Sequence, residues 1–183
     1  MGGHHSAKPK SETWLTPPKL IEAFGPFDLD PCAAPSPRPW PTAKRHIELP
    51  EDGFTADWGD SFVWLNPPYT TKEATRWMRR MADHNNGIAL MFARTETKWF
   101  VESIWERATA LLFLHGPRLH FHRPDGTRAK NNSGAPSVLI AYGVGAAYRL
   151  MFSDLGHFVL LKDLTPEPDY ALATPISQDA SDA

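Results

Sequence analysis

The feature that most constrains the fold is a short apolar run, residues 62–65, that ends in Asn66, Pro67, Pro68 and Tyr69. The run has strand character, and two consecutive prolines cannot continue a ladder of hydrogen bonds. The chain must therefore leave a sheet here in a stiff conformation. We expect that conformation to turn the Asn66 amide oxygen and the Pro67 carbonyl outward as two acceptors, with the Tyr69 ring beside them. Such a group suits a planar amine; the alternative is a plain proline-rich turn.

Apolar runs and helical patterns alternate along the chain, which predicts an α/β fold. Strands are expected at 27–30, 46–49, 62–65, 87–93 and 109–114, and helices at 19–24, 72–83 and 97–108. Residues 137–142, 146–155 and 158–161 are expected to add a strand, a helix and a closing strand. The order is typical of a mostly parallel sheet with helices on both faces. Ligands bind outside the carboxyl ends of such strands, so Asp30, Asp57 and Asn66 are expected to face one pocket.

The charge distribution divides the chain into three predicted parts: a disordered N-terminus at 1–11, one folded domain at 12–162 and a disordered acidic tail at 163–183. The whole chain of 183 residues has a net charge of −2. The tail carries five acids and no Lys or Arg, so the first 162 residues have a net charge of +3. A mildly basic body is compatible with binding nucleic acid.

The basic side chains concentrate in one segment, residues 116–135, which we interpret as an inserted hairpin or loop at the rim of the site. Its alternation of basic and apolar residues suits contacts to phosphates and base edges. His120 and His122 lack a third ligand at useful spacing, so no metal site is expected. The candidate DNA-binding residues are Arg76, Arg118, His120, His122, Arg123, Arg128 and Lys130.

Other features exclude several classes of protein. The single cysteine, Cys32, rules out an internal disulfide and fits a reducing, cytoplasmic setting. No apolar run approaches the ~20 residues that a membrane-spanning helix needs. The N-terminal residues contain no apolar segment that would serve as an export signal.

Five short motifs follow one another along the chain. They are Trp-Leu-Thr-Pro-Pro at 14–18, Phe-Asp-Leu-Asp-Pro-Cys-Ala at 27–33, Trp58 followed by Asn-Pro-Pro-Tyr at 66–69, Trp-Phe at 99–100, and Gly-Pro-Arg-Leu-His-Phe at 116–121. Taken in order, they resemble those of the phage-type DNA N6-adenine methyltransferases of the Dam group. The resemblance covers roughly residues 12–145. It departs from the family at one point, since the family usually has Gly-Arg-Leu where this chain has Gly-Pro-Arg-Leu at 116–119.

The resemblance implies a Rossmann-like methyltransferase fold. It also implies an enzyme that uses S-adenosylmethionine and acts on an adenine flipped out of double-stranded DNA. The implied location is the cytoplasm, that of a bacterial host if the gene belongs to a bacteriophage. The implied catalytic residues are Asn66, Pro67, Pro68 and Tyr69. The implied cofactor-binding residues are Trp14, Thr16 and Pro17 at the methionine end, Asp30, Pro31, Cys32 and Ala33 around its ammonium group, Glu48 (or Asp52) at the ribose, and Asp57 with Trp58 at the adenine.

Alternatives stay open at this stage. Exocyclic cytosine N4 methylation needs nearly the same chemistry, and Asn-Pro-Pro-Tyr also occurs in enzymes that methylate a protein glutamine. A catalytically dead DNA-binding decoy is a third alternative. Pro31 and Cys32 resemble the nucleophile of cytosine C5 methyltransferases, although they follow the first predicted strand rather than the fourth. Trp58 has an equally plausible role as a residue that fills the edge of the core.

Overall fold

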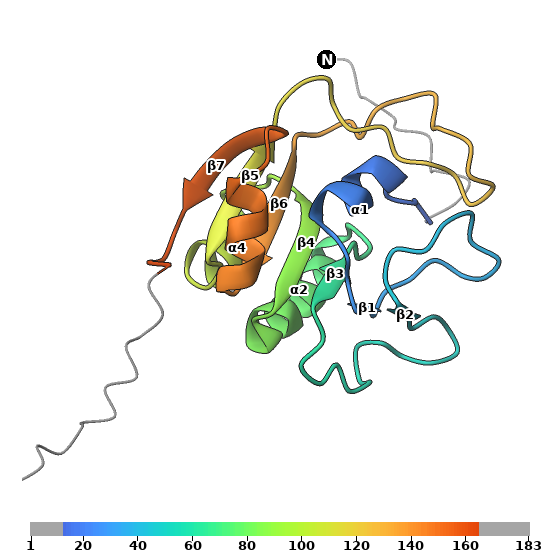
Figure 1. Ribbon diagram of the computed structural model, residues 1–183, viewed down its shortest axis with the longest axis horizontal. Helices are drawn as coiled ribbons and strands as arrows, with labels where there is room; N and C mark the ends of the chain where they lie inside the picture. Colours follow the sequence, from blue (N-terminus) through green and yellow to red (C-terminus); the bar gives the residue numbers. More distant parts are fainter. Residues whose placement is uncertain (1–12, 165–183) are drawn as a thin grey trace, which may run out of the picture.

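The computed structural model describes residues 13–164 (Figure 1). The N-terminal segment predicted at 1–11, and all but the first two residues of the predicted acidic tail, lie outside this range. No helix within it is long and apolar enough to cross a membrane.

The described residues form one seven-stranded sheet with the strand order β2-β1-β3-β4-β6-β5-β7 (Figure 1). All seven expected strands are present, with their ends shifted by a few residues. They are β1 (Leu29–Asp30), β2 (Arg45–His46), β3 (Val63–Leu65), β4 (Gly87–Phe92), β5 (Ala110–Leu114), β6 (Ser137–Tyr142) and β7 (Gly156–Leu160).

The prediction of a mostly parallel sheet is wrong. The pairs β1–β2, β1–β3 and β3–β4 are parallel but short, whereas β4–β6, β5–β6 and β5–β7 form longer antiparallel ladders. A parallel neighbour needs a crossover connection, but the chain between β5 and β6 is a loop that brings β6 directly back beside β5. The six residues of β6 are all buried, and a strand covered on both faces shows the same apolar run in either direction.

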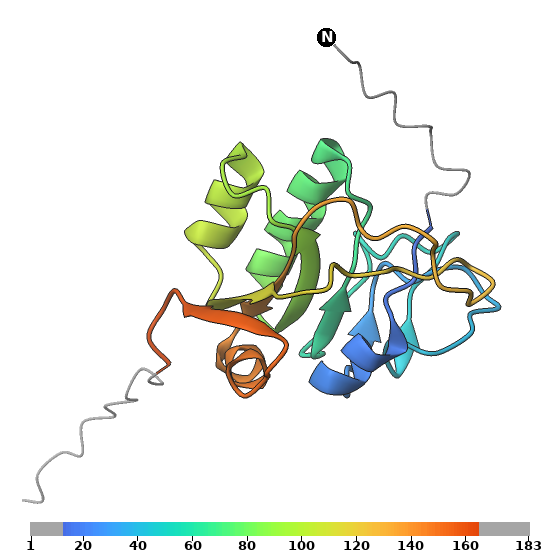
Figure 2. The same ribbon diagram turned by 90° about the horizontal axis from the view of Figure 1, so that it is seen from above.

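Helices cover both faces of the sheet, as predicted (Figure 2). One face carries α1 (Pro18–Phe24) and α4 (Val144–Met151), which bury Leu20, Phe24 and Leu150 against the strands. The other face carries α2 (Thr71–His84) and α3 (Lys98–Phe100), which continues as the π-helix η1 (Val101–Trp105).

Helix α2 connects the Asn-Pro-Pro-Tyr segment to β4. It begins at Thr70, whose side chain accepts a hydrogen bond from the Glu73 N–H, and it ends at Asn85 in the left-handed conformation. Its buried stripe includes Trp77, Met78 and Met81, as the helical spacing predicted. The helix therefore returns the chain across the sheet and leaves residues 66–69 at the carboxyl edge.

A glycine sets the close approach of β3 and β4. Gly87 has φ +154°, and a Cβ at this position would lie 2.2 Å from the Val63 carbonyl oxygen. Only glycine tolerates this conformation and contact. The spacing of the two strands, and with it the position of Asn66 beyond β3, depends on this residue.

Candidate active site

The carboxyl ends of β1 and β3 bring two of the predicted site residues, Asp30 and Asn66, to one edge of the sheet. The strands are parallel neighbours with Leu29 opposite Val63. Asp30, the last residue of β1, and Asn66, which follows β3, therefore lie at the same edge, as the sequence predicted.

The Asn66 side chain is held at both ends of its amide. Its Nδ2 donates to the Thr16 hydroxyl oxygen at 3.2 Å and lies 3.4 Å from the Trp14 carbonyl oxygen. The Tyr69 hydroxyl donates to Asn66 Oδ1 at 2.7 Å. The N-terminal segment and the Asn-Pro-Pro-Tyr segment, some fifty residues apart in sequence, therefore meet at this amide.

Tyr69 is packed rather than free-standing. Its ring lies 4.3 Å from the ring of Phe92 and 6.1 Å from that of Phe121, between centroids. Its hydroxyl is also 3.3 Å from the Leu90 carbonyl oxygen. Burial raises the pKa of Tyr69, so the phenol stays neutral and keeps its proton for donation.

Phe121 is a site neighbour that the sequence analysis did not single out. It is 6% exposed and belongs to the predicted basic segment. The available signal was its place in the alternation of apolar and basic residues there. Phe121 is buried against Tyr69, while its neighbours His120 and His122 are partly exposed.

Asp30 is a buried carboxylate at the end of β1, only 4% exposed. It accepts hydrogen bonds from the Cys32 N–H at 3.0 Å and from the Thr42 hydroxyl. Desolvation nevertheless raises the pKa of Asp30 to about 6. A nearby cation would favour the charged form of such a carboxylate and lower its pKa.

The Pro31, Cys32 and Ala33 backbone is fixed beside Asp30. The Ala33 N–H donates to the Ile47 carbonyl at 3.1 Å, and a Cβ on Gly53 would lie 1.7 Å from the Pro31 carbonyl oxygen. The Cys32 thiol is half-buried, and desolvation raises its pKa to about 12. The thiol is therefore protonated at neutral pH, which is unsuited to a nucleophile.

Trp58 lies in the core instead of at the open edge. It is 3% exposed, and its Nε1 donates to the Gly53 carbonyl at 2.8 Å. Its ring is stacked with Trp77 at 6.4 Å, and the Arg80 guanidinium lies 4.4 Å from its centre. This geometry fits the interpretation of Trp58 as a residue that fills the edge of the core.

Two predicted acids are already engaged within the protein. Glu48 accepts from the Ser36 N–H at 2.5 Å and hydroxyl at 2.8 Å, and pairs with Arg38 at 2.8 Å. The hydrogen bonds from Ser36 lower the pKa of Glu48. Asp57 is exposed and accepts from the Gly59 N–H at 2.9 Å. These contacts order the loops around β2, and the structure does not direct either carboxylate toward Asn66.

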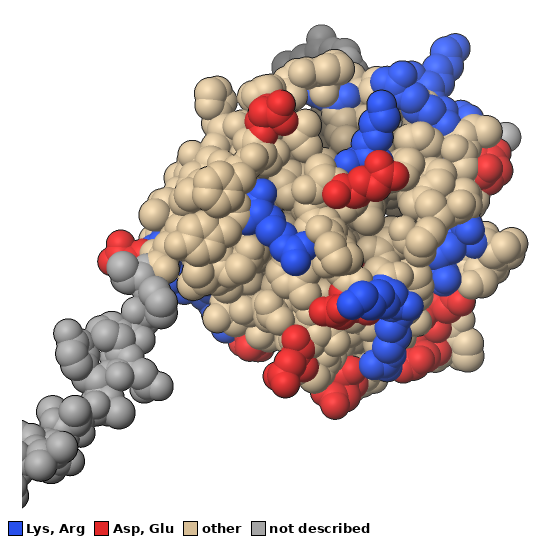
Figure 3. All heavy atoms as spheres, in the orientation of Figure 1, with Lys and Arg blue, Asp and Glu red and all other residues tan. Residues whose placement is uncertain are grey.

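The predicted basic hairpin is a loop that is tied to the N-terminal segment. His122 forms isolated antiparallel bridges with Leu15 and Arg128, and its ring lies edge-on to Trp40 at 5.2 Å. Figure 3 shows Lys and Arg side chains at the upper right, where Figure 1 draws this loop. Exposed cations on it are Arg118, Arg123, Arg128 and Lys130.

The loop cations differ from Arg76 in their partners. None of the six ion pairs found within residues 13–164 includes a cation of this loop. Arg76, by contrast, pairs with Asp52 at 3.5 Å and lies 3.7 Å over the Phe54 ring. The structure therefore separates Arg76 from the loop cations with which it was grouped. His120 contacts the Ala129 carbonyl at 3.1 Å and so stabilises the loop itself.

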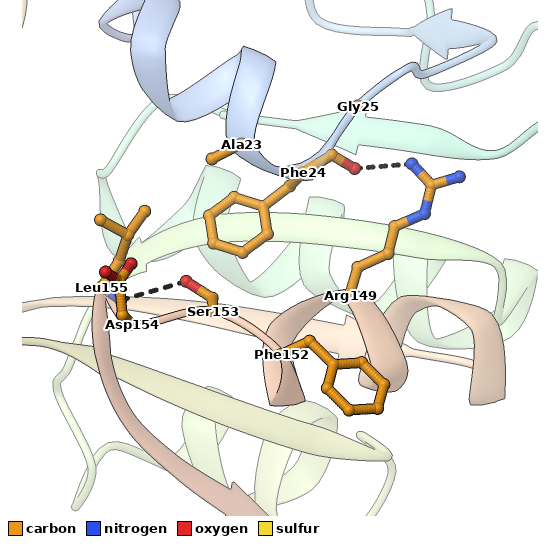
Figure 4. A pocket seen from close by; sticks show the side chains of 8 residues that line it. All are labelled: Ala23, Phe24, Gly25, Arg149, Phe152, Ser153, Asp154 and Leu155. Carbon is orange, nitrogen blue, oxygen red and sulfur yellow. Dashed lines mark hydrogen bonds between the residues drawn. The ribbon is translucent and has the colours of Figure 1, made fainter.

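Two surface hollows lie away from Asn66. One of about 330 Å³ lies between α1 and the end of α4, where Arg149 donates to the Phe24 carbonyl at 2.6 Å (Figure 4). The other, of about 460 Å³, lies where β5 ends and β6 begins, beside Arg118 and Ser137. Asn66 and Tyr69 line neither hollow. Within the described part of the chain, no group of three or more His, Cys, Asp or Glu side chains is arranged to hold a metal ion.

Comparison with known proteins identifies the class as a methyltransferase. The model of the family described as DNA N-6-adenine-methyltransferase (Dam) matches residues 3–153, so the chain belongs to this family. A DNA N-6-adenine-methyltransferase of Haemophilus phage HP1 is 25% identical over 125 residues, which cover 67% of this chain and 70% of that protein. No solved structure matches. The family resemblance inferred from the ordered motifs is confirmed.

Proposed function

We propose that the protein transfers a methyl group from S-adenosylmethionine to the N6 amine of an adenine flipped out of double-stranded DNA. The observation that carries the proposal is the position of Asn66 Oδ1 and the Pro67 carbonyl at the tip of β3 in a member of this family. Among residues 13–164, no donor contacts the Pro67 carbonyl, while Tyr69 occupies Oδ1.

The two acceptors would increase the nucleophilicity of the adenine amine. The exocyclic amine of adenine is a poor nucleophile because its lone pair is delocalised into the ring. Acceptance of both amine protons by Asn66 and Pro67 draws the nitrogen toward tetrahedral geometry and directs the lone pair at the methyl group. Alignment of two reactants contributes up to ~7–11 kcal/mol by analogy with intramolecular reactions. In this scheme the amine takes the place of the Tyr69 hydroxyl at Oδ1.

The methyl donor, when bound, supplies an electrophilic methyl group on a sulfonium. The buried Asp30 carboxylate fits its ammonium group, because a cation would offset the desolvation that now raises the pKa of Asp30. Pro31, Cys32 and Ala33 offer rigid backbone beside it. Trp14 and Thr16, which is followed by Pro17, flank the same edge through their contacts with Asn66. Glu48 and Asp57 enter this proposal only if they exchange their present partners for the donor.

Base flipping follows from the position of the acceptors. A base stacked inside a duplex cannot bring its amine to a strand tip, so it must leave the helix. The exposed cations of the loop at 118–130 are suited to hold the flanking phosphates.

Radiolabelled methyl transfer followed by nucleoside analysis tests the proposal. The expected product is N6-methyladenine in duplex DNA. Label in N4-methylcytosine or in a protein glutamine would replace the proposal with one of the alternatives. DNA binding without any transfer would favour the decoy.

Cys32→Ser is expected to retain methyl transfer. The substitution changes one side-chain atom and leaves the backbone N–H that donates to Asp30 in place. A thiol with a pKa of about 12 is not available as a thiolate near neutral pH. Loss of activity in a variant whose thermal unfolding is unchanged would instead support a covalent route through the thiol.

Arg128→Ala is expected to weaken DNA binding across sequences and to reduce the slope of log Kd against log salt concentration by about 1. The reason is that each neutralised phosphate releases a condensed counterion. Arg107→Ala is the matched control, because it removes the same charge from a guanidinium that pairs with Asp83 at 2.7 Å. An equal slope for both variants would show that Arg128 does not contact a phosphate.

A further inference from the structure

We propose that Thr16 is a positioning residue that holds the Asn66 amide in the orientation in which Oδ1, rather than Nδ2, faces the substrate amine. The inference rests on the proposed function and assigns Thr16 a role in it besides contact with the methyl donor. The two ends of an asparagine amide have nearly the same shape, so hydrogen-bond partners decide which end points where.

The partners on one side of the amide allow a single orientation. The Trp14 carbonyl oxygen can only accept, and it lies 3.4 Å from Asn66 Nδ2, too far for a strong hydrogen bond. The Thr16 hydroxyl oxygen lies closer, at 3.2 Å. If the amide turned over, Oδ1 would face the Trp14 carbonyl, and two acceptors would oppose each other. The accept-only Trp14 carbonyl therefore selects this orientation, and the Thr16 hydroxyl holds the amide in it through the shorter of the two contacts.

The partner on the other side allows both orientations. The Tyr69 hydroxyl now donates to Oδ1 at 2.7 Å. In the reversed orientation it would accept from Nδ2 and donate its proton to the Leu90 carbonyl, which is 3.3 Å away. Tyr69 also has to leave Oδ1 when the substrate amine arrives. During the reaction, only the contacts on the Thr16 side continue to orient the amide.

Thr16 is itself held in a fixed position. It is 2% exposed, and its carbonyl accepts from the Trp40 Nε1 at 3.1 Å. The preceding residue, Leu15, exchanges two backbone hydrogen bonds of 2.9 Å with His122. A buried hydroxyl on anchored backbone is suited to orient a reacting group, because little freedom is lost when the complex forms.

The test compares kcat with donor binding in Thr16→Val and Thr16→Ser. Valine keeps the shape of threonine and removes the acceptor, so kcat at saturating donor and DNA is expected to fall by about 3- to 10-fold, as for loss of one hydrogen bond. Serine keeps the acceptor and is expected to restore kcat. The Kd for S-adenosylmethionine, from equilibrium binding, is expected to stay within about twofold, since the donor contact that dominates is assigned to Asp30.

The outcomes separate this inference from the proposed function. An unchanged kcat in Thr16→Val, or a higher donor Kd with unchanged kcat, would overturn the positioning role while leaving adenine methylation in place. A wild-type protein that transfers no methyl group to adenine would overturn the proposed function and this inference with it. Thr16→Ala compared with Thr16→Ser gives the same contrast if the buried valine prevents folding.

Discussion

Replacement of Asn66 with alanine is expected to lower kcat for methyl transfer by about 10²–10³-fold, the range seen when one preorganised partner of a transition state is removed. The substitution deletes the acceptor for one amine proton, and this acceptor contributes most when the nitrogen becomes tetrahedral. Because Asn66 contacts Thr16, Trp14 and Tyr69 but not Asp30, binding of S-adenosylmethionine is expected to persist. Single-turnover kinetics and equilibrium donor binding measure the two effects separately.

Asn86→Ala is the matched control for this experiment. Asn86 precedes β4 at the opposite edge of the sheet, where its Nδ2 donates to the carbonyls of Asp60 at 3.0 Å and Ser61 at 3.3 Å. The control loses an amide of the same size and is expected to keep its kcat. An Asn66→Ala protein with the kcat of the wild type would contradict the assigned role of the acceptor pair.

The sequence predicted those parts of the site that depend on local pattern and strand direction. Asp30 and Asn66 each end an apolar run, and parallel neighbours bring such ends to the same edge. The Asn66 contacts to Thr16 and Trp14 were not predictable, because they join segments some fifty residues apart that show no shared periodicity. A resemblance to known motifs drew attention to these residues without giving their geometry.

The parts of the site that the sequence could not place concern residues whose role depends on tertiary partners. Trp58 and Glu48 are the residue types that a purine and a ribose prefer, yet Trp58 packs on Trp77, and Glu48 pairs with Arg38. An indole or a carboxylate in a loop serves the core and a ligand equally well, and only the neighbours decide. The direction of β6 failed for the same reason, since its buried residues fit both parallel and antiparallel pairing.

Asp30→Asn is expected to raise the free energy of unfolding at pH 7 by about 1–3 kcal/mol. Burial raises the pKa of Asp30 from 3.8 to about 6, so ionisation is less favourable in the folded state than in the unfolded state. The free energy of unfolding of the wild type therefore falls as pH rises from about 4 to about 6, and Asp30 lowers it no further above about pH 6. The asparagine variant avoids this loss, and its side chain can still accept from Cys32 and contact Thr42. Urea unfolding at pH 4 and pH 7 measures the difference, which is expected only at pH 7.

The same substitution is expected to weaken donor binding, because it removes the negative charge proposed to hold the ammonium group. The combination of higher stability and lower donor affinity is what distinguishes a binding carboxylate from one that serves the fold. Asp28→Asn is the control, and its effect on stability is expected to have the opposite sign. The hydrogen bond from Lys44 lowers the pKa of Asp28, so loss of the Asp28 carboxylate is expected to reduce stability at pH 7. Donor binding is expected to stay unchanged. An Asp30→Asn protein that matches the wild type in both measurements at pH 7 would remove Asp30 from the proposed donor site.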